Sequence, residues 1–146
     1  MSKSLKLKNN NYWDSTGIVH NKKKLNEILE PVILWEGDLG EAGKSATLID
    51  DYTEYEKIII LGQWQGRYCS TFIYPDSQSN GSLEARFFNN SYMYHYKCYF
   101  EFSGTTLKLV SGAGLVNNSS GGISGAFTGS CQMSINKIIG YKKKGA

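Results

Sequence analysis

The sequence predicts an all-β protein, an antiparallel β-sandwich or jelly-roll-like head, preceded by a short N-terminal neck. Two observations support this: one long segment alternates strictly between apolar and polar residues, and eight candidate strands accompany a single short helical pattern. The composition agrees, since 16 glycines and 10 tyrosines with only 2 prolines favour strands that are joined by glycine-rich turns.

Residues 1–30 form the predicted neck. Leu5 and Leu7 alternate with lysines, as in a short strand, and Asn21 is a suitable N-cap for a two-turn helix that ends near Leu29. Such a helix is too short to be stable alone. The segment is nevertheless rich in large apolar side chains, so we expect it to pack on its own domain or on another chain. These side chains are Leu5, Leu7, Trp13, Ile18, Leu25, Ile28 and Leu29.

Residues 31–146 form the predicted head. Its candidate strands are 32–37, 45–49, 57–64, 67–74, 83–88, 91–102, 105–110 and 131–141. Residues 58–61 are apolar at every position, which predicts a central strand covered on both faces. Gln65-Gly66 predicts a tight hairpin turn. Residues 111–125, which are mostly Gly, Ser and Asn, are predicted to form a long loop that is either mobile or packed against a neighbouring chain.

Residues 92–102 define the centre of the head. Their even positions are aromatic or cysteine, and their odd positions are mostly polar. Successive side chains of a strand point to opposite faces, so the even positions are expected in the core. Cys98 then faces inward, whereas His95 and Tyr99 face outward.

The three cysteines are predicted to be buried, reduced thiols. Cys69, Cys98 and Cys131 show no metal-ligand spacing, and their odd number argues against a disulfide framework. Reduced thiols would place folding in a reducing compartment.

Several function classes lack support. The net charge of +3 comes largely from lysines near the two ends, and no basic stripe interleaved with aromatics indicates nucleic-acid binding. No apolar run approaches the length of a membrane span, and no signal peptide is recognisable. We therefore expect neither nucleic acid nor membrane insertion.

No catalytic or cofactor motif is recognisable. Gly43-Lys44-Ser45 lacks the first glycine of a phosphate-binding loop, because Asp38 stands at that position, and a strand rather than a helix follows. The carboxylates of residues 50–56 suit either glycan hydrolysis or, more simply, a polar corner above Tyr52 or Tyr55. With two histidines and scattered cysteines, we expect no metal and no cofactor.

Aromatic and polar side chains remain as candidates for ligand binding. We predict a saccharide site on the outward face of the long strand and the nearby turn. It consists of Trp64, Arg67, Tyr68, His95 and Tyr99. Packing of Trp64 and Tyr68 inside the sandwich is the competing interpretation.

The order of the segments resembles that of a known family. YWDSTGIVHNKKKLNEIL, from Tyr12, resembles the neck of receptor-binding proteins on the tail fibres of phages and prophages of Gram-positive bacteria. The segment VILWEGDLGEAGKSATLIDDYTEYEKIIILG looks like the opening of their C-terminal head domains. FEFSGTTLKLVSG and MSINKIIGYKK are similar to the closing hairpin and strand of those domains.

The resemblance implies a function. Members of this family form homotrimers at the tip of the tail and bind cell-wall saccharides or teichoic acids, so the chain is expected to be a non-enzymatic adhesin. It would lie on the virion after assembly in the host cytoplasm. A tail enzyme that hydrolyses or deacetylates the glycan, and a purely structural trimer tip, are the alternatives. Tail-fibre chains are normally longer, so either a C-terminal fragment or a small separate reading frame is expected.

Overall fold

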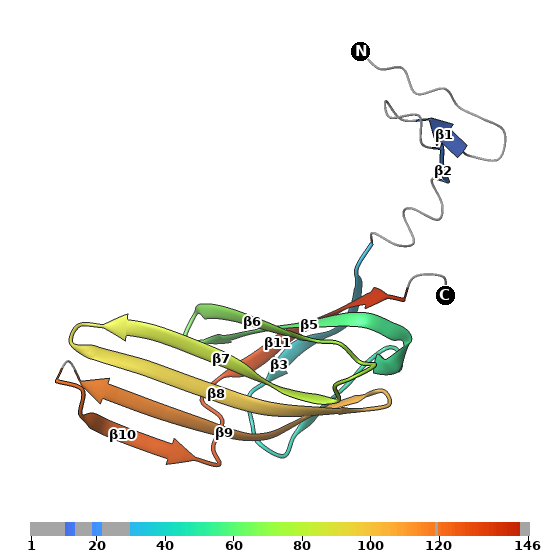
Figure 1. Cartoon of the computed structure of the whole chain (residues 1–146). Helices are drawn as coiled ribbons and strands as arrows, with labels where there is room; N and C mark the ends of the chain where they lie inside the picture. The colour runs from blue at the N-terminus through green and yellow to red at the C-terminus, as the bar shows by residue number, and fades with distance from the viewer. Residues whose placement is uncertain (1–10, 14–18, 22–29, 119, 144–146) are drawn as a thin grey trace.

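Two antiparallel sheets pack face to face into a β-sandwich, which confirms the predicted fold class (Figure 1). The computed structural model describes residues 11–13, 19–21, 30–118 and 120–143. Within these ranges the chain contains strands and one short 3₁₀ turn at Tyr52–Glu54, and no α-helix. Eight strands occupy the eight segments that the sequence predicts; their ends differ by at most three residues, except that β9 continues eight residues further.

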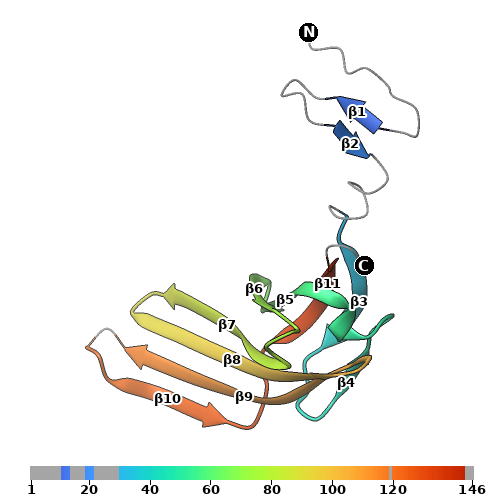
Figure 2. The same cartoon turned by 45° about the vertical axis from the view of Figure 1, so that its right-hand side comes forward.

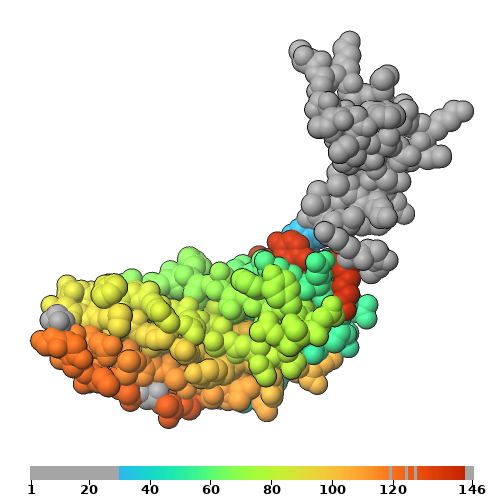
Figure 3. Space-filling view, in the orientation of Figure 1, coloured from blue at the N-terminus to red at the C-terminus, as the bar shows by residue number. Residues whose placement is uncertain are grey.

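The larger sheet, here the long sheet, contains β10, β9, β8 and β7 in that order, and β4 also pairs with β9. In the space-filling view of Figure 3, the yellow and orange atoms of this sheet extend along the length of the head. Their bounds are Ser45–Thr47 for β4, Asn80–Asn89 for β7, Tyr92–Ser103 for β8, Thr106–Asn118 for β9 and Ile123–Thr128 for β10. Strand β8 lies in the middle, between β7 and β9.

The second sheet, here the short sheet, has the order β3-β11-β5-β6 and packs across one end of the long sheet (Figure 2). The bounds of its strands are Val32–Leu39 for β3, Tyr55–Trp64 for β5, Arg67–Ile73 for β6 and Ser134–Lys142 for β11. The chain leaves β3, the first strand of this sheet, and returns to pair with it only through β11, its last strand.

Two short strands precede the sandwich. β1 (Asn11–Trp13) pairs antiparallel with β2 (Val19–Asn21). Asn21, the predicted helix cap, is the last residue of β2. The predicted strand around Leu5 and the helix that ends near Leu29 lie outside the described residues, so the neck of residues 1–30 stays a prediction.

The core lies between the facing sheets and follows the predicted alternation. On β8, Tyr96, Cys98, Phe100 and Phe102 are buried. They pack with the inward residues of the other strands in one apolar cluster, which includes Leu34, Tyr55, Ile58, Ile60, Leu83, Leu107, Leu109, Ile135 and Ile138. Each such large side chain contributes roughly 1.5–3 kcal/mol through its removal from water.

One prediction about β5 was only partly right. β5 is an interior strand between β11 and β6, as expected. However, only Ile58 and Ile60 are fully buried, whereas Ile59 and Leu61 lie half-buried on the outer face of the short sheet. No other described segment of the chain covers that face completely. The prediction that both faces of this strand are covered was therefore wrong.

The predicted loop at residues 111–125 was also wrong. β9 continues to Asn118, and β10 begins at Ile123, so most of this stretch forms a paired hairpin. Gly112 shows why a glycine occurs inside a strand here. The backbone of Ser130 and Cys131 lies against its Cα, and a side chain at this position would collide with it.

The prediction of three reduced thiols was wrong. Cys98 of β8 and Cys131 form a disulfide, and they are 33 positions apart in the sequence. The two cysteines meet because the segment before β11 passes beneath β8. Local sequence patterns do not reveal this path. Cys69 is the one free cysteine in the described part of the chain, and burial raises the pKa of its thiol to about 11, so it is a poor nucleophile at neutral pH.

We predict that Cys131→Ser lowers the free energy of unfolding by about 3–4 kcal/mol, because the cross-link restricts the unfolded chain across a loop of this length. Urea unfolding monitored by tryptophan fluorescence measures the loss. Cys69→Ser is the matched control and is expected to change stability little. Titration of thiols in the denatured, unreduced protein is expected to detect one thiol per chain; three thiols would contradict the disulfide.

Candidate functional site

The five residues predicted to bind a ligand lie on three different surfaces. His95 and Tyr99 both lie on the outer face of the long sheet, as predicted, with Lys97 between them on β8. Trp64 and Arg67 pair with each other at the end of the β5–β6 hairpin, in the register that faces the long sheet. Tyr68 is next along β6 and faces the opposite way, on the outer side of the short sheet. These residues therefore do not form one common site.

Trp64 belongs to the interior and does not project from the end of a sheet. Its ring stacks on Phe87, with centroids 4.5 Å apart, and on Tyr96, at 5.1 Å. Phe87 in turn stacks almost parallel on Tyr94, at 4.8 Å. The faces of the Trp64 ring are used by other protein rings, which supports the packing interpretation for this residue.

Arg67 completes this aromatic row. Its guanidinium lies 4.4 Å from the centroid of the Phe87 ring, in a cation–π contact. The row fills the end of the sandwich, where the long sheet extends past the turn of the β5–β6 hairpin. Arg67 is exposed and charged, so it lies at the boundary between this apolar row and water.

The outer face of the long sheet is the best candidate for a binding site. Tyr99 stands in the middle of β8 with 40% of its surface exposed. It lines two separate hollows, one toward each end of the strand. Because β8 is paired on both sides, the backbone that carries Tyr99 is held rigidly in place.

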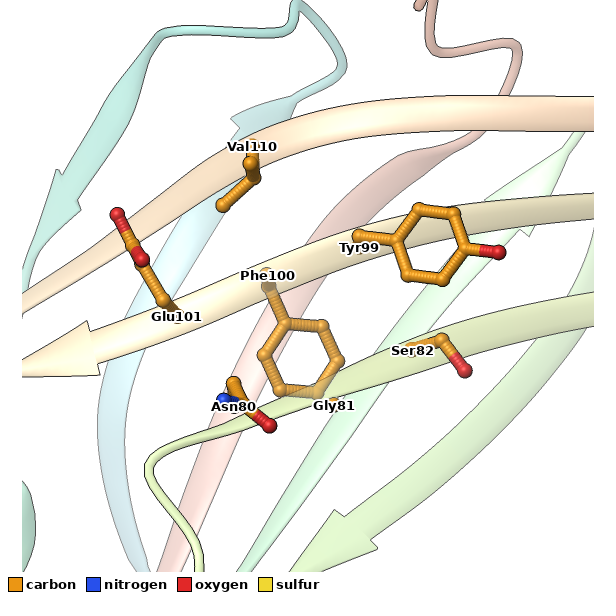
Figure 4. A pocket seen from close by; sticks show the side chains of 7 residues that line it. All are labelled: Asn80, Gly81, Ser82, Tyr99, Phe100, Glu101 and Val110. Carbon is orange, nitrogen blue, oxygen red and sulfur yellow. The ribbon is translucent and has the colours of Figure 1, made fainter. Parts of the chain in front are cut away.

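The larger hollow has a volume of about 460 Å³ (Figure 4). Its floor is the sheet itself, where Gly81 pairs with Phe100. Gly81 is required there, because the ring of Phe100 occupies the space that a side chain at this position would need. An apolar surface with a few polar groups at the rim is typical of small-ligand sites. The side chains at the rim are Tyr99, Val110, Asn80, Ser82 and Glu101.

The smaller hollow has a volume of about 220 Å³ and includes both predicted residues that face this side. His95, Lys97 and Tyr99 come from β8, and Leu115, Ala126 and Thr128 come from β9 and β10. These last three residues were not predicted: Leu115 lies in the stretch 111–125 that was predicted to be a loop, and no strand was predicted for Ala126 and Thr128. The alternation of Leu115 with small residues was the only available signal.

A charged cluster lies beside the hollows. The carboxylate of Glu84 is 3.0 Å from Lys97, 3.2 Å from His95 and 3.3 Å from Arg86. The hydrogen bond from Lys97, together with His95, lowers the pKa of Glu84, although partial burial opposes the change. The stabilisation by this cluster is therefore present above the ordinary carboxyl pKa and is lost as the pH falls through the lowered value.

The carboxylates between residues 50 and 56 form the predicted polar corner. Asp51 caps the 3₁₀ turn by accepting a hydrogen bond from the backbone N–H of Thr53, which lowers the pKa of Asp51. Asp50 accepts a hydrogen bond of 2.7 Å from the hydroxyl of Tyr55, whose ring is fully buried beneath the corner. These two carboxylates thus have structural partners. No group of three potential metal ligands occurs among the described residues.

Comparisons with known proteins do not identify the chain. No protein-family model matches it, and no curated protein is significantly similar to it. No helix in the described part of the chain is long and apolar enough to cross a membrane. Functional inference therefore rests on the geometry of the surfaces and on the resemblance of the sequence motifs.

The two interpretations of the aromatic residues predict different effects on stability. Trp64→Ala is expected to lower the free energy of unfolding by roughly 2–4 kcal/mol, because it leaves a gap between Phe87 and Tyr96. Tyr99→Ala is expected to change it by less than about 0.5 kcal/mol. Denaturant unfolding measures both. Equal losses for the two variants would contradict the placement of Trp64 inside and Tyr99 outside.

Proposed function

We propose that this chain is the receptor-binding head of a phage tail fibre, and that it binds a saccharide of the host cell surface without cleaving it. The observation that carries the proposal is the position of Tyr99, an accessible ring on a rigid strand between two hollows with polar rims. The ring provides a flat apolar surface, and the rims provide hydrogen-bonding groups. Pyranose rings, which combine apolar C–H faces with hydroxyl edges, match this arrangement.

The size of the surface suits an extended ligand. Two hollows flank one tyrosine, so neighbouring sugar units of a glycan can occupy both while the ring contacts the unit between them. By analogy with bases on aromatic side chains, one such stack contributes about 1–2 kcal/mol. Binding strong enough for adhesion then needs several chains at one tip, because simultaneous contacts multiply the apparent affinity.

The resemblance to tail-fibre heads supplies the biological setting. It supports location at the tip of the virion tail, with teichoic acid or another wall glycan as the partner. Reduced cysteines were the reason to expect folding in a reducing compartment, and the Cys98–Cys131 disulfide removes that reason. It is compatible with a virion surface, where disulfides persist; if the chain assembles in the host cytoplasm, the bond would form after release from the cell.

We predict that Tyr99→Ala weakens co-sedimentation with host cells several-fold, because it removes the surface between the two hollows. Tyr92→Ala is the matched control. It removes the same side chain from the same strand, at 41% exposure, but in the inward register of β8 rather than the outward one. A panel of Gram-positive strains is the source of cells.

Normal binding by Tyr99→Ala, or equal losses for both variants, would count against this face as the receptor site. Binding of the unmodified protein to no strain would favour the structural tip. Incubation with purified cell wall tests the enzymatic alternative: we expect no release of reducing ends or acetate, and their release would refute a purely adhesive function.

We further propose that the chain acts as a homotrimer. The apolar content of residues 1–30 supports this, because so short a segment cannot bury its seven large apolar side chains alone. A closed symmetric assembly buries such surfaces against one another.

Light scattering at micromolar concentration is expected to give three times the mass of the 16.3 kDa chain. Removal of residues 1–30 is expected to shift the assembly toward the monomer. A monomer mass for the full chain would overturn the trimer, and an unchanged trimer after the truncation would exclude the neck as its main interface.

A further inference from the structure

A third hollow, at the end of the short sheet, is separate from the surfaces described above. It has a volume of about 310 Å³ and lies where three segments meet. These are the end of β3 with Asp38 and Gly40, the β5–β6 turn, and the segment that enters β11. Its side chains are unlike those around Tyr99, because neutral amides dominate.

The walls of this hollow are preformed. Gln65 and Gly66 both have left-handed backbone conformations, with φ of 46° and 77°, which fix the tight turn. Cys131 ties the opposite wall to β8 through the disulfide. Gly62 allows β5 to approach β11 closely, since the carbonyl of Ser134 occupies the place of a side chain there. A ligand would therefore meet a site that needs little ordering.

The polar groups of the hollow are available to a ligand. Gln63, Gln65 and Gln132 all line it, and among the described residues no hydrogen bond uses their side-chain amides. Each amide offers two donor hydrogens and one acceptor oxygen. The Asp38 carboxylate adds a further acceptor. The lining contains no lysine, arginine or histidine.

Tyr68 adds an aromatic surface next to the amides. It is directly opposite Gln63 in the β5–β6 register, so both side chains stand on the same face of the short sheet at close distance. Tyr68 is 87% exposed, more than any other large apolar or aromatic residue of the described chain. In contrast to Trp64, its ring makes no contact with another described ring that would occupy its faces.

We propose that this hollow, with Tyr68 at its edge, is a second saccharide site that selects neutral sugars. Amide groups pair with vicinal hydroxyls in both directions, as donor and as acceptor, and an exposed ring packs on the C–H face of a pyranose. Without a cation, and with Asp38 present, the hollow disfavours phosphate groups. It therefore recognises uncharged sugar units rather than the phosphates of a teichoic acid chain. This inference is independent of binding at Tyr99.

The test uses the full chain labelled with ¹⁵N and titrated with free N-acetylglucosamine, glucose or rhamnose to millimolar concentrations. At least one sugar is expected to cause saturable shifts of the side-chain amides of Gln63, Gln65 and Gln132. Glycerol phosphate and inorganic phosphate are expected to cause none. No saturable shift with any of the three sugars, or shifts with the phosphates alone, would overturn the proposal.

Variants locate the site. Gln63→Ala combined with Gln132→Ala is expected to raise Kd at least about tenfold through the loss of two sets of hydrogen bonds, and Tyr68→Ala several-fold. Gln78→Ala and Phe88→Ala are matched controls; both side chains are exposed and neither lines the hollow. Unchanged affinity in the double variant, with an unchanged unfolding midpoint, would overturn the proposal.

Tyr99→Ala separates this inference from the proposed function. Shifts at the glutamines are expected to persist in Tyr99→Ala, whatever that change does to binding of cells. Sugar shifts that vanish in Tyr99→Ala would place all binding on the long sheet and would refute the second site alone. Normal cell binding by Tyr99→Ala would refute the proposed face without affecting the glutamine shifts.

Discussion

Side chains on a β-strand alternate between its two faces, and β8 uses both faces for different purposes. Tyr96, Cys98 and Phe100 point inward, where they anchor the core and supply one half of the disulfide. His95 and Tyr99, at odd-numbered positions of the same strand, point outward and line the hollows of the candidate site. A shift of one residue in the pairing of β8 would bury the site and expose the core. The apolar content of the inner face therefore also holds the outer face in position.

The segment before β11 links the two sheets. Cys131 is bonded to β8, and the chain then enters β11, which pairs with both β3 and β5. Gly112 and Gly62 allow this segment to lie directly against the neighbouring strands. The disulfide thus links this segment to the long sheet, and the two glycines allow it to pack closely between the sheets. They also form a wall of the amide-rich hollow, so the rigidity of that hollow follows from the packing of the sandwich.

The two proposed binding surfaces differ in chemistry. Around Tyr99 the side chains are charged, and they are paired with one another through Glu84. Beside Tyr68 they are neutral amides with one carboxylate. A charged surface tolerates phosphate-bearing ligands, whereas the second surface disfavours them. On the two proposals together, a head with both surfaces would contact different parts of a composite wall glycan, and the contacts of several chains would add in avidity.

Local alternation determined much of this protein. From the sequence alone it predicts the sandwich, the eight strand positions and the outward direction of His95 and Tyr99, because a period of two residues is a property of the strand itself. Tertiary structure decided the rest. The glycine-rich residues of β9 and β10 form strands because they find partners and because Gly112 faces Ser130. Cys98 meets Cys131 only through the path of the chain. Trp64 lies inside because the long sheet covers its face, and the glutamines converge because three distant segments end at the same place. Each of these facts depends on contacts between residues far apart in sequence, which no local pattern encodes.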